Sequence, residues 1–332
     1  MTERVTLAQG NGGRRMRELI AQVFVTAFGA AAPDTRVDAA IVGDPGGPLV
    51  LTTDGFTVQP LEFPGGDLGA LAVHGSLNDL AVAGAEPRYL TLGVILEEGF
   101  EIEVLRRLVA SFAREAAAAN VRLVAGDTKV VPRGHGGGAY FTVTAAGVLA
   151  RPGLTPAAPR PGDRLLVSGP LGDHGVAVML AREDFGMSGD VRSDCAPVLG
   201  LCRALWPLPG LRFTRDPTRG GLAGVTHEIA TACGHGIRLV DDSIPIRDQT
   251  RVICEMLGFD ALTLACEGRV IAVVACDEAP RALRRWRNLP SGRDAAIIGT
   301  IVAGASTVVL ETPLGGERII EELDDDPLPR IC

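Results

Sequence analysis

The chain has 332 residues, of which 46% are hydrophobic, and 40 acidic against 32 basic side chains give a formal net charge of −8. This length predicts two domains with substantial cores, and the acidic balance argues against a nucleic-acid-binding protein, which would carry a basic stripe. The longest uncharged stretch, residues 295–310, is broken by glycine, serine and threonine. It therefore predicts two strands and a turn instead of a membrane span.

The cysteines and the first residues bear on the compartment. Seven cysteines form no CxxC pair, a pattern typical of reduced thiols in the cytoplasm. Residues 1–4 are followed by no apolar segment of the kind that a signal peptide contains. We therefore expect a cytoplasmic protein that does not span a membrane.

The first half of the chain alternates helical and extended patterns. In chain order, these patterns predict a helix over 14–28, strand-like sequence from 37 to about 57, a helix over 67–84, a strand over 89–96, a helix over 103–119, and strands over 121–125 and 139–148. Four prolines then fall within residues 151–163, which we interpret as a linker between domains.

The second half repeats this mixture of elements. Helices are predicted near 174–183, 194–205, 219–233, 248–257 and 279–288, with strands near 165–168, 237–240, 262–265, 270–275, 296–302 and 307–311. We interpret the chain as an α+β protein with domains over 1–150 and 164–320, joined by the 151–163 linker and followed by a tail over 321–332.

The tail ends in a thiol, Cys332, which lies beyond Pro327 and Pro329. Prolines stiffen a tail into an extended arm, so this arm could carry a nucleophile into a pocket of its own or a partner chain. The alternative is a frayed terminus without a function, because chain ends are usually disordered.

One lysine stands out because it is the only lysine in the sequence: Lys129, in Gly126-Asp127-Thr128-Lys129. Arginine serves everywhere else. A retained lysine indicates a need for a compact ammonium group that can bind phosphate or move protons. We expect this motif to begin the loop after the 121–125 strand, where catalytic residues often lie.

Aspartates and glycines suggest phosphate and metal binding. Backbone amides at a helix start form an anion site, and glycines precede two predicted helices, in Gly10-Asn11-Gly12-Gly13 and in Asp216-Pro217-Thr218-Arg219-Gly220-Gly221. Asp38, Asp54, Asp79 and Asp127 lie at strand ends or helix starts, and converging aspartates hold Mg²⁺ against nucleotide phosphates. Capping and turn formation is the alternative for any single aspartate.

Longer motifs now indicate a family. They are Phe63-Pro-Gly-Gly-Asp67, Asn78-Asp-Leu-Ala81, Gly126-Asp-Thr-Lys-Val-Val131, Ser193-Asp-Cys-Ala-Pro197, Arg215-Asp-Pro-Thr-Arg-Gly-Gly-Leu222 and the terminal Pro329-Arg-Ile-Cys332. With them the chain resembles the HypE family of hydrogenase-maturation carbamoyl dehydratases, in the superfamily of aminoimidazole-ribotide synthetase and selenophosphate synthetase.

The resemblance implies a PurM-like homodimer with a barrel shared between N-terminal domains, and ATP with Mg²⁺ in the cleft between domains. It also implies that HypF carbamoylates Cys332, that ATP-dependent dehydration yields a thiocyanate, and that the cyanide passes to iron on a HypC–HypD complex. Lys129 and Glu267 match the catalytic lysine and glutamate of the family.

Three positions depart from the family pattern, namely Cys266 and Arg269 beside Glu267, and His227 beside Glu228; Asn11 also replaces a usual serine. Two other functions stay open. One is a synthetase of the same superfamily that acts on a small molecule, and the other is a non-catalytic carrier whose tail docks on a partner.

Overall fold

A four-stranded sheet organises the first half of the chain, in the order β1-β6-β4-β5. Its strands are β1 (Leu49–Phe56), β4 (Ala85–Glu97), β5 (Arg122–Val131) and β6 (Ala139–Leu149). The computed structural model describes residues 3–10, 13–35, 39–182 and 189–322. β4 pairs in parallel with β5 and antiparallel with β6, so β1 and β5 are the two outer strands.

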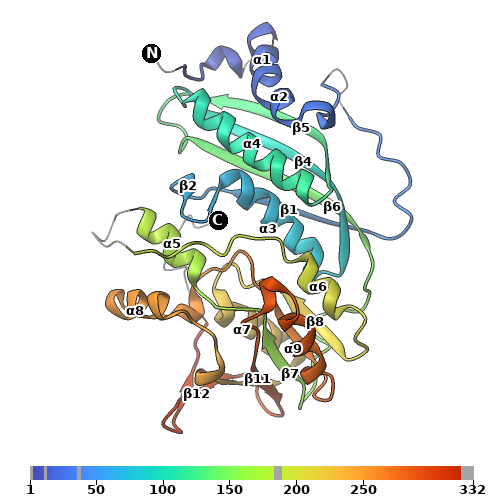
Figure 1. Cartoon of the computed structure of the whole chain (residues 1–332), viewed down its shortest axis with the longest axis vertical. Helices are drawn as coiled ribbons and strands as arrows, with labels where there is room; N and C mark the ends of the chain where they lie inside the picture. Colours follow the sequence, from blue (N-terminus) through green and yellow to red (C-terminus); the bar gives the residue numbers. More distant parts are fainter. Residues whose placement is uncertain (1–2, 11–12, 36–38, 183–188, 323–332) are drawn as a thin grey trace.

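Helices cover one face of this sheet. α3 (Leu68–Val82) and α4 (Ile102–Ala118) lie side by side, and α3 contacts β1, β4 and β6. α3 begins where the Asp67 carboxylate accepts the Ala70 amide hydrogen bond. Almost every residue of α3 is buried, because the helix lies between the sheet and the second half of the chain (Figure 1).

Short elements complete the first half. They are η1 (Leu7–Gln9), α1 (Gly13–Leu19), the π-helical η2 (Ile20–Val25), α2 (Thr26–Phe28), η3 (Gly29–Ala31), β2 (Glu62–Phe63) and β3 (Gly66–Asp67). The helical segment from α1 to α2 lies over the β5 edge of the sheet in Figure 1, and η1 packs against β5.

The second half holds a seven-stranded sheet in the order β13-β12-β9-β11-β7-β10-β8. The strands are β7 (Arg164–Val167), β8 (Leu211–Arg215), β9 (Gly236–Val240), β10 (Ile271–Val274), β11 (Ala296–Val302), β12 (Val308–Glu311) and β13 (Glu317–Ile319). The helices are α5 (Asp173–Ala181), α6 (Leu199–Leu205), α7 (Gly221–Cys233), α8 (Asp248–Leu257) and α9 (Ala279–Arg287), with short turns η4 (Asp241–Ser243), η5 (Ala261–Thr263) and η6 (Pro290–Gly292). Most strand pairs are antiparallel, which confirms the α+β interpretation.

Several sequence-based boundaries need correction. Lys129 lies inside β5, not in a loop, because β5 stays paired with β4 as far as Val131. Residues 262–265 form no strand, since η5 turns there, and the strand-like segment from 37 narrows to β1 among the described residues. The predicted helix over 194–205 begins only at Leu199, and β8 and β13 were not predicted.

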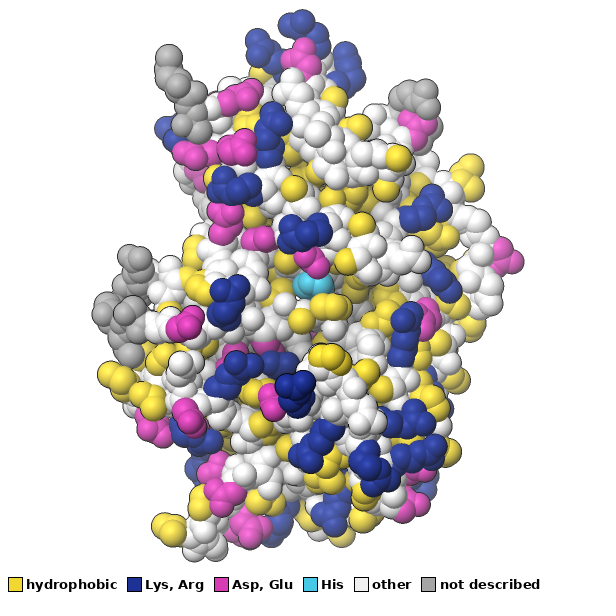
Figure 2. Space-filling model, viewed as in Figure 1, with side chains coloured by type: hydrophobic (Ala, Val, Ile, Leu, Met, Phe, Trp, Pro, Cys, Tyr) yellow, Lys and Arg dark blue, Asp and Glu magenta, His cyan; other side chains and the backbone are white. Residues whose placement is uncertain are grey.

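The surface is mixed in charge. On the face shown in Figure 2, acidic and basic side chains are mixed in the upper part of the molecule. Arginines are more frequent in the lower part, where α9 lies. The last turn of α9 contributes Arg284, Arg285 and Arg287. Of the helices in the described part of the chain, none has the length and apolar character that a membrane span requires.

Candidate active site

Three aspartates from distant parts of the chain meet between the two halves. Asp54 comes from β1, Asp79 from α3 and Asp216 from the end of β8, and all three line a cavity of about 590 Å³. The Thr52 hydroxyl donates a 2.7 Å hydrogen bond to Asp79 Oδ2, which ties β1 to α3. We call Asp54, Asp79 and Asp216 the aspartate cluster.

The fold holds this cluster together by packing α3 against both halves. The hydroxyl of buried Thr214, on β8, donates a 2.6 Å hydrogen bond to the Val82 carbonyl at the end of α3. This contact brings the end of β8, and with it Asp216, close to Asp79. The cavity is also lined by Thr218 and Arg219, which follow Asp216 in the same motif.

Burial and mutual repulsion change the acidity of the cluster. Burial, followed by the charge of Asp79, raises the pKa of Asp54 to about 6, although Arg219 and Arg215 oppose the shift. Burial and Asp79 likewise raise the pKa of Asp216 to about 7. Burial and mutual repulsion disfavour the charged forms of these carboxylates. A cation placed among them would stabilise the charged forms.

The cluster suits Mg²⁺ in the chemistry of its donors. Carboxylate oxygens are the ligands that Mg²⁺ prefers, and this ion usually keeps only one or two of them beside water and substrate phosphates. Among the described residues, no three or more His, Cys, Asp or Glu side chains are placed so that they could hold one metal ion together, so this arrangement supplies at most two of the three carboxylates to a single ion. The sequence had placed Asp216 with the phosphate-binding residues, not with the metal ligands.

Glu267 lies next to the aspartate cluster. It lines a small cavity of about 50 Å³ together with Asp54, Asp79 and Asp216. The side chain is only 2% exposed, and its Oε1 has no hydrogen-bond partner among the described residues. Burial, and then the charge of Asp216, raises the pKa of Glu267 well above its usual value. A buried carboxyl group with a free oxygen and raised pKa is suited to proton transfer.

The glycines before α7 bring its N-terminus to the same cavity. Gly220 and Gly221 both have positive φ values, of 70° and 56°. A Cβ atom at Gly221 would lie 2.6 Å from the carbonyl oxygens of Leu262 and Leu264, so a larger residue does not fit. The start of α7 thus follows directly after Thr218 and Arg219, which line the aspartate cavity.

The other predicted residues form a second group on β5. Lys129 Nζ lies 3.0 Å from Asp127 Oδ2, and their side chains are 62% and 61% exposed. The intervening Thr128 is buried and its amide donates to Asp127 Oδ1 at 2.9 Å. Gly10 directly follows η1, and Gly13 is the first residue of α1. Because η1 packs against β5, Gly10 lies close to this second group.

One chain does not bring these two groups together. The strand order places Asp54 and Asp127 on opposite outer strands, about 14 Å apart at the usual spacing of ~4.8 Å between neighbouring strands. Asp54 pairs in register with Val143 of β6, Leu92 of β4 and thus Gly126 of β5. Asp127 is one residue further on and points to the opposite face. The predicted Asn11, Gly12, Asp38 and Cys332 lie outside the described residues.

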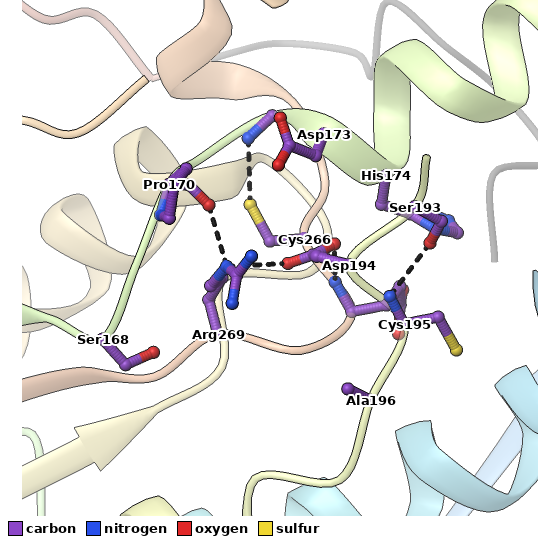
Figure 3. Close-up of polar contacts among 12 residues, drawn as sticks. Ser168, Pro170, Asp173, His174, Ser193, Asp194, Cys195, Ala196, Cys266 and Arg269 are labelled. Carbon is purple, nitrogen blue, oxygen red and sulfur yellow. Dashed lines mark hydrogen bonds and ion pairs between the residues drawn. The ribbon is translucent and has the colours of Figure 1, made fainter. Parts of the chain in front are cut away.

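The departures from the family pattern have defined partners in the structure. Figure 3 shows Arg269 between the Pro170 carbonyl, 2.9 Å from its Nε, and the Asp194 carboxylate, 3.2 Å away. The Gly172 amide donates to Cys266 Sγ at 3.2 Å. His227 Nε2 lies 2.8 Å from the Ile320 carbonyl, at the end of the described chain.

Known proteins share this whole architecture. The model for AIR synthase related proteins matches residues 36–149 with its N-terminal domain and residues 160–311 with its C-terminal domain. A carbamoyl dehydratase HypE of Azotobacter vinelandii is 47% identical over 332 residues, covering 99% of this chain and 97% of the relative. The chain belongs to the HypE family.

HypE structures superpose closely on the chain. A crystal structure of hydrogenase maturation protein HypE in complex with ATP has a TM-score of 0.93 at 41% identity, covering 98% of this chain and 99% of that one. The HypE–HypF complex gives 0.80 at 40% identity, covering 94% and 100%. The two-domain PurM-like fold is thereby confirmed. A thiamine monophosphate kinase from Aquifex aeolicus, at 18% identity and a TM-score of 0.63, shares the fold alone.

Proposed function

We propose that the chain is an ATP-dependent carbamoyl dehydratase of hydrogenase maturation, which converts a thiocarbamate on Cys332 into a thiocyanate. The observation that carries this proposal is Glu267, whose buried carboxyl group lies next to the aspartate cluster with an Oε1 that has no hydrogen-bond partner among the described residues. The HypE relatives named as carbamoyl dehydratases support it, as does the HypE crystal structure in complex with ATP.

The reaction needs ATP as the phosphoryl donor and a base that removes protons from the substrate nitrogen. The carbonyl oxygen of the thiocarbamate attacks the γ-phosphorus of ATP, ADP leaves, and the nitrogen loses one proton. The C–O bond then breaks, phosphate leaves with its electron pair, and the nitrogen loses its second proton to give the nitrile. Glu267 would accept a nitrogen proton, since its raised pKa makes the carboxylate a stronger base.

Mg²⁺, when bound, supplies charge neutralisation on the phosphates. Two carboxylates of the aspartate cluster would hold it, and the sequence suggests Asp38 and, from the other subunit of the dimer proposed below, Asp127 as further ligands. Arg219 and the amides after Gly220 would contact phosphate oxygens, because a helix N-terminus favours anions.

We propose that the base of ATP binds in a second cavity. About 360 Å³ of space lies between the α1–α2 segment and residues 123–128 of β5, lined by apolar side chains such as Phe24 and Leu123 and by Asp127 and Thr128. Adenine would fit such a pocket, whose walls are both apolar and polar, and the phosphates would extend past Lys129. Thr128 and the 10–13 glycine segment would then lie along the nucleotide.

We further propose a homodimer whose shared barrel joins the two groups of site residues. β1 and β5 are outer strands, and Leu49, Leu51 and Ile95 are exposed hydrophobic residues on the sheet. A two-fold dimer that pairs β1 with β5 of the partner would cover this face and remove both edges. It would also bring Lys129 of one subunit toward Asp54 of the other.

The partners follow from the proposed reaction. HypF would carbamoylate Cys332, and a HypF complex of a HypE relative supports this. A HypC–HypD complex would receive the cyanide, and the reaction would take place in the cytoplasm.

The test is the intact mass of the chain after incubation with HypF, carbamoyl phosphate and ATP. We expect a carbamoyl adduct that loses one water only when ATP is present, and no adduct on a Cys332→Ala variant. A small-molecule synthetase would form no adduct and would turn over ATP regardless of Cys332. A carrier would hold the carbamoyl adduct unchanged in the presence of ATP.

A further inference from the structure

The peptide groups of Glu267 are held from two sides. Its amide donates a 3.1 Å hydrogen bond to Asp194 Oδ1, and its carbonyl accepts a 3.1 Å hydrogen bond from Asn78 Nδ2. Asp194 belongs to the loop before α6, whereas Asn78 lies on α3 in the first half of the chain. The main chain of Glu267 is therefore fixed by both halves of the molecule, while its Oε1 has no partner among the described residues.

The side-chain amide of Asn78 is hydrogen-bonded through both its nitrogen and its oxygen. Nδ2 also donates to the Ala196 carbonyl at 3.1 Å, and Oδ1 accepts from the Val198 amide at 2.9 Å. Asn78 is only 2% exposed, so a lost hydrogen bond here would not be replaced by water. This one side chain fastens the 196–198 segment and the Glu267 carbonyl to α3.

Asp194 is held in turn by Arg269. The guanidinium Nε lies 3.2 Å from Asp194 Oδ2, and the two side chains are 11% and 1% exposed. Figure 3 shows Arg269 beside Asp194 of the 193–196 loop, with its Nε also donating a hydrogen bond to the Pro170 carbonyl. Only glycine fits at position 268, between Glu267 and Arg269, because a Cβ atom there would lie 1.9 Å from the Asp194 carbonyl oxygen.

We propose that Asn78 and Asp194 are positioning residues for Glu267, which set its carboxyl group against the site that α3 also builds through Asp79. This inference rests on the proposed function. Asn78 and Asp79 are consecutive on α3, so one helix places both the aspartate cluster and, through Asn78, the loop that carries the base. A purely structural bridge between the halves would instead stabilise the fold without any specific link to Glu267.

A double-mutant cycle separates these possibilities. Asn78→Asp is nearly isosteric and keeps the acceptor for Val198, but it replaces both donated hydrogen bonds by repulsion between oxygens. We expect the ATP-dependent loss of water from carbamoylated chain to slow on the order of 10- to 100-fold, as for a displaced catalytic group. ATP affinity should not change. In a Glu267→Gln background, the same substitution should have no further effect, because its target is already removed.

Two further variants serve as a substitute and as a control. Asn78→Ala serves if Asn78→Asp does not fold, and Trp286→Phe removes another buried hydrogen bond, Nε1 to the Leu201 carbonyl at 3.0 Å, away from Glu267. Trp286→Phe should lower stability but leave the dehydration rate and its dependence on Glu267 unchanged. Multiplicative losses in Asn78→Asp/Glu267→Gln, or wild-type rates in Asn78→Asp, would overturn the positioning role.

Hydrogen exchange tests the same hydrogen bonds without any chemistry. Peptides that cover 194–198 and 264–268 should exchange faster in Asn78→Asp than in the wild type, and unchanged exchange in both would overturn the proposal. If the wild-type chain loses no water from a carbamoyl adduct, the proposed function fails, whereas this exchange measurement still tests the hydrogen bonds that Asn78 makes.

Discussion

Asp54 and Lys129 lie on the two outer strands of one sheet, at opposite edges and on opposite faces. Asp54 faces α3 within the aspartate cluster, whereas Lys129 is exposed on the face that the helices leave free. In the proposed dimer, the partner subunit brings its β5 edge to β1, so one ATP molecule would contact Asp54 of one subunit and Lys129 of the other. This relationship makes the proposed dimer testable through activity.

Mixed dimers test whether the site is shared. We expect Asp54→Asn and Lys129→Ala homodimers to be inactive, since each lacks one group in both sites. After mixing and exchange of subunits, one site in each mixed dimer regains both groups, so about a quarter of the wild-type rate should return. No recovery in proven mixed dimers would show that each subunit works with its own Lys129.

Substitutions at Lys129 separate two roles of the ammonium group. Lys129 is 62% exposed and paired with Asp127, so we expect it to bind phosphate as a charge. Lys129→Ala should then slow dehydration roughly 100-fold or more, in the range of a lost electrostatic contact, and Lys129→Arg should keep a clear part of the rate. Arginine as inactive as alanine would instead indicate proton transfer by the lysine.

The aspartate cluster predicts a pH-dependent stability. Because the pKa of Asp216 is raised to about 7, the native state binds its proton more tightly than the unfolded chain. Stability therefore falls as pH rises from about 4 to about 7 and stays reduced above that. Asp216→Asn should be more stable than the wild type at pH 8 by roughly 2–4 kcal/mol, at about 1.4 kcal/mol per pKa unit, and similar near pH 4.

Urea unfolding without metal ions measures this difference. Added Mg²⁺ should stabilise the wild type at pH 8 more than it stabilises Asp216→Asn, because the ion relieves the same repulsion. A constant difference between the two proteins from pH 4 to pH 8 would contradict the account of the cluster.

Gly221 predicts a localised loss of stability. Gly221→Ala forces a side chain into a backbone with φ of 56° and within 2.6 Å of two carbonyl oxygens. We expect a loss of about 2 kcal/mol or more in urea unfolding. Gly200→Ala is the control, because no atom lies within 4 Å of its Cβ position, and alanine there should be neutral or slightly stabilising.

The sequence predicted most elements because their patterns are local. Helices α8 and α9 and strand β11 follow the hydrophobic periodicity closely, whereas η5 looked like a strand because residues 262–265 are apolar. β5 continued past its apolar part into Asp127 and Lys129, because pairing with β4 supplies hydrogen bonds that no side-chain pattern reveals. Tertiary pairing thus set the boundaries that periodicity missed.

Local sequence offers candidate site residues one at a time but does not give their grouping. Local sequence suggests which carboxylates bind cations, yet only the fold shows that Asp216 meets Asp54 and Asp79 while Asp127 lies at the far edge. Asn78 and Asp194 stood inside the recognised motifs without a role, since their hydrogen bonds to Glu267 span 189 and 73 residues. Contacts over such separations leave no trace in local patterns.

Mass spectrometry of the carbamoylated chain tests most directly whether Glu267 accepts a proton during dehydration. With ATP, the wild-type adduct should lose one water, while Glu267→Gln should lose it roughly 100-fold or more slowly and still bind ATP. Loss of water from Glu267→Gln at the wild-type rate would contradict the account.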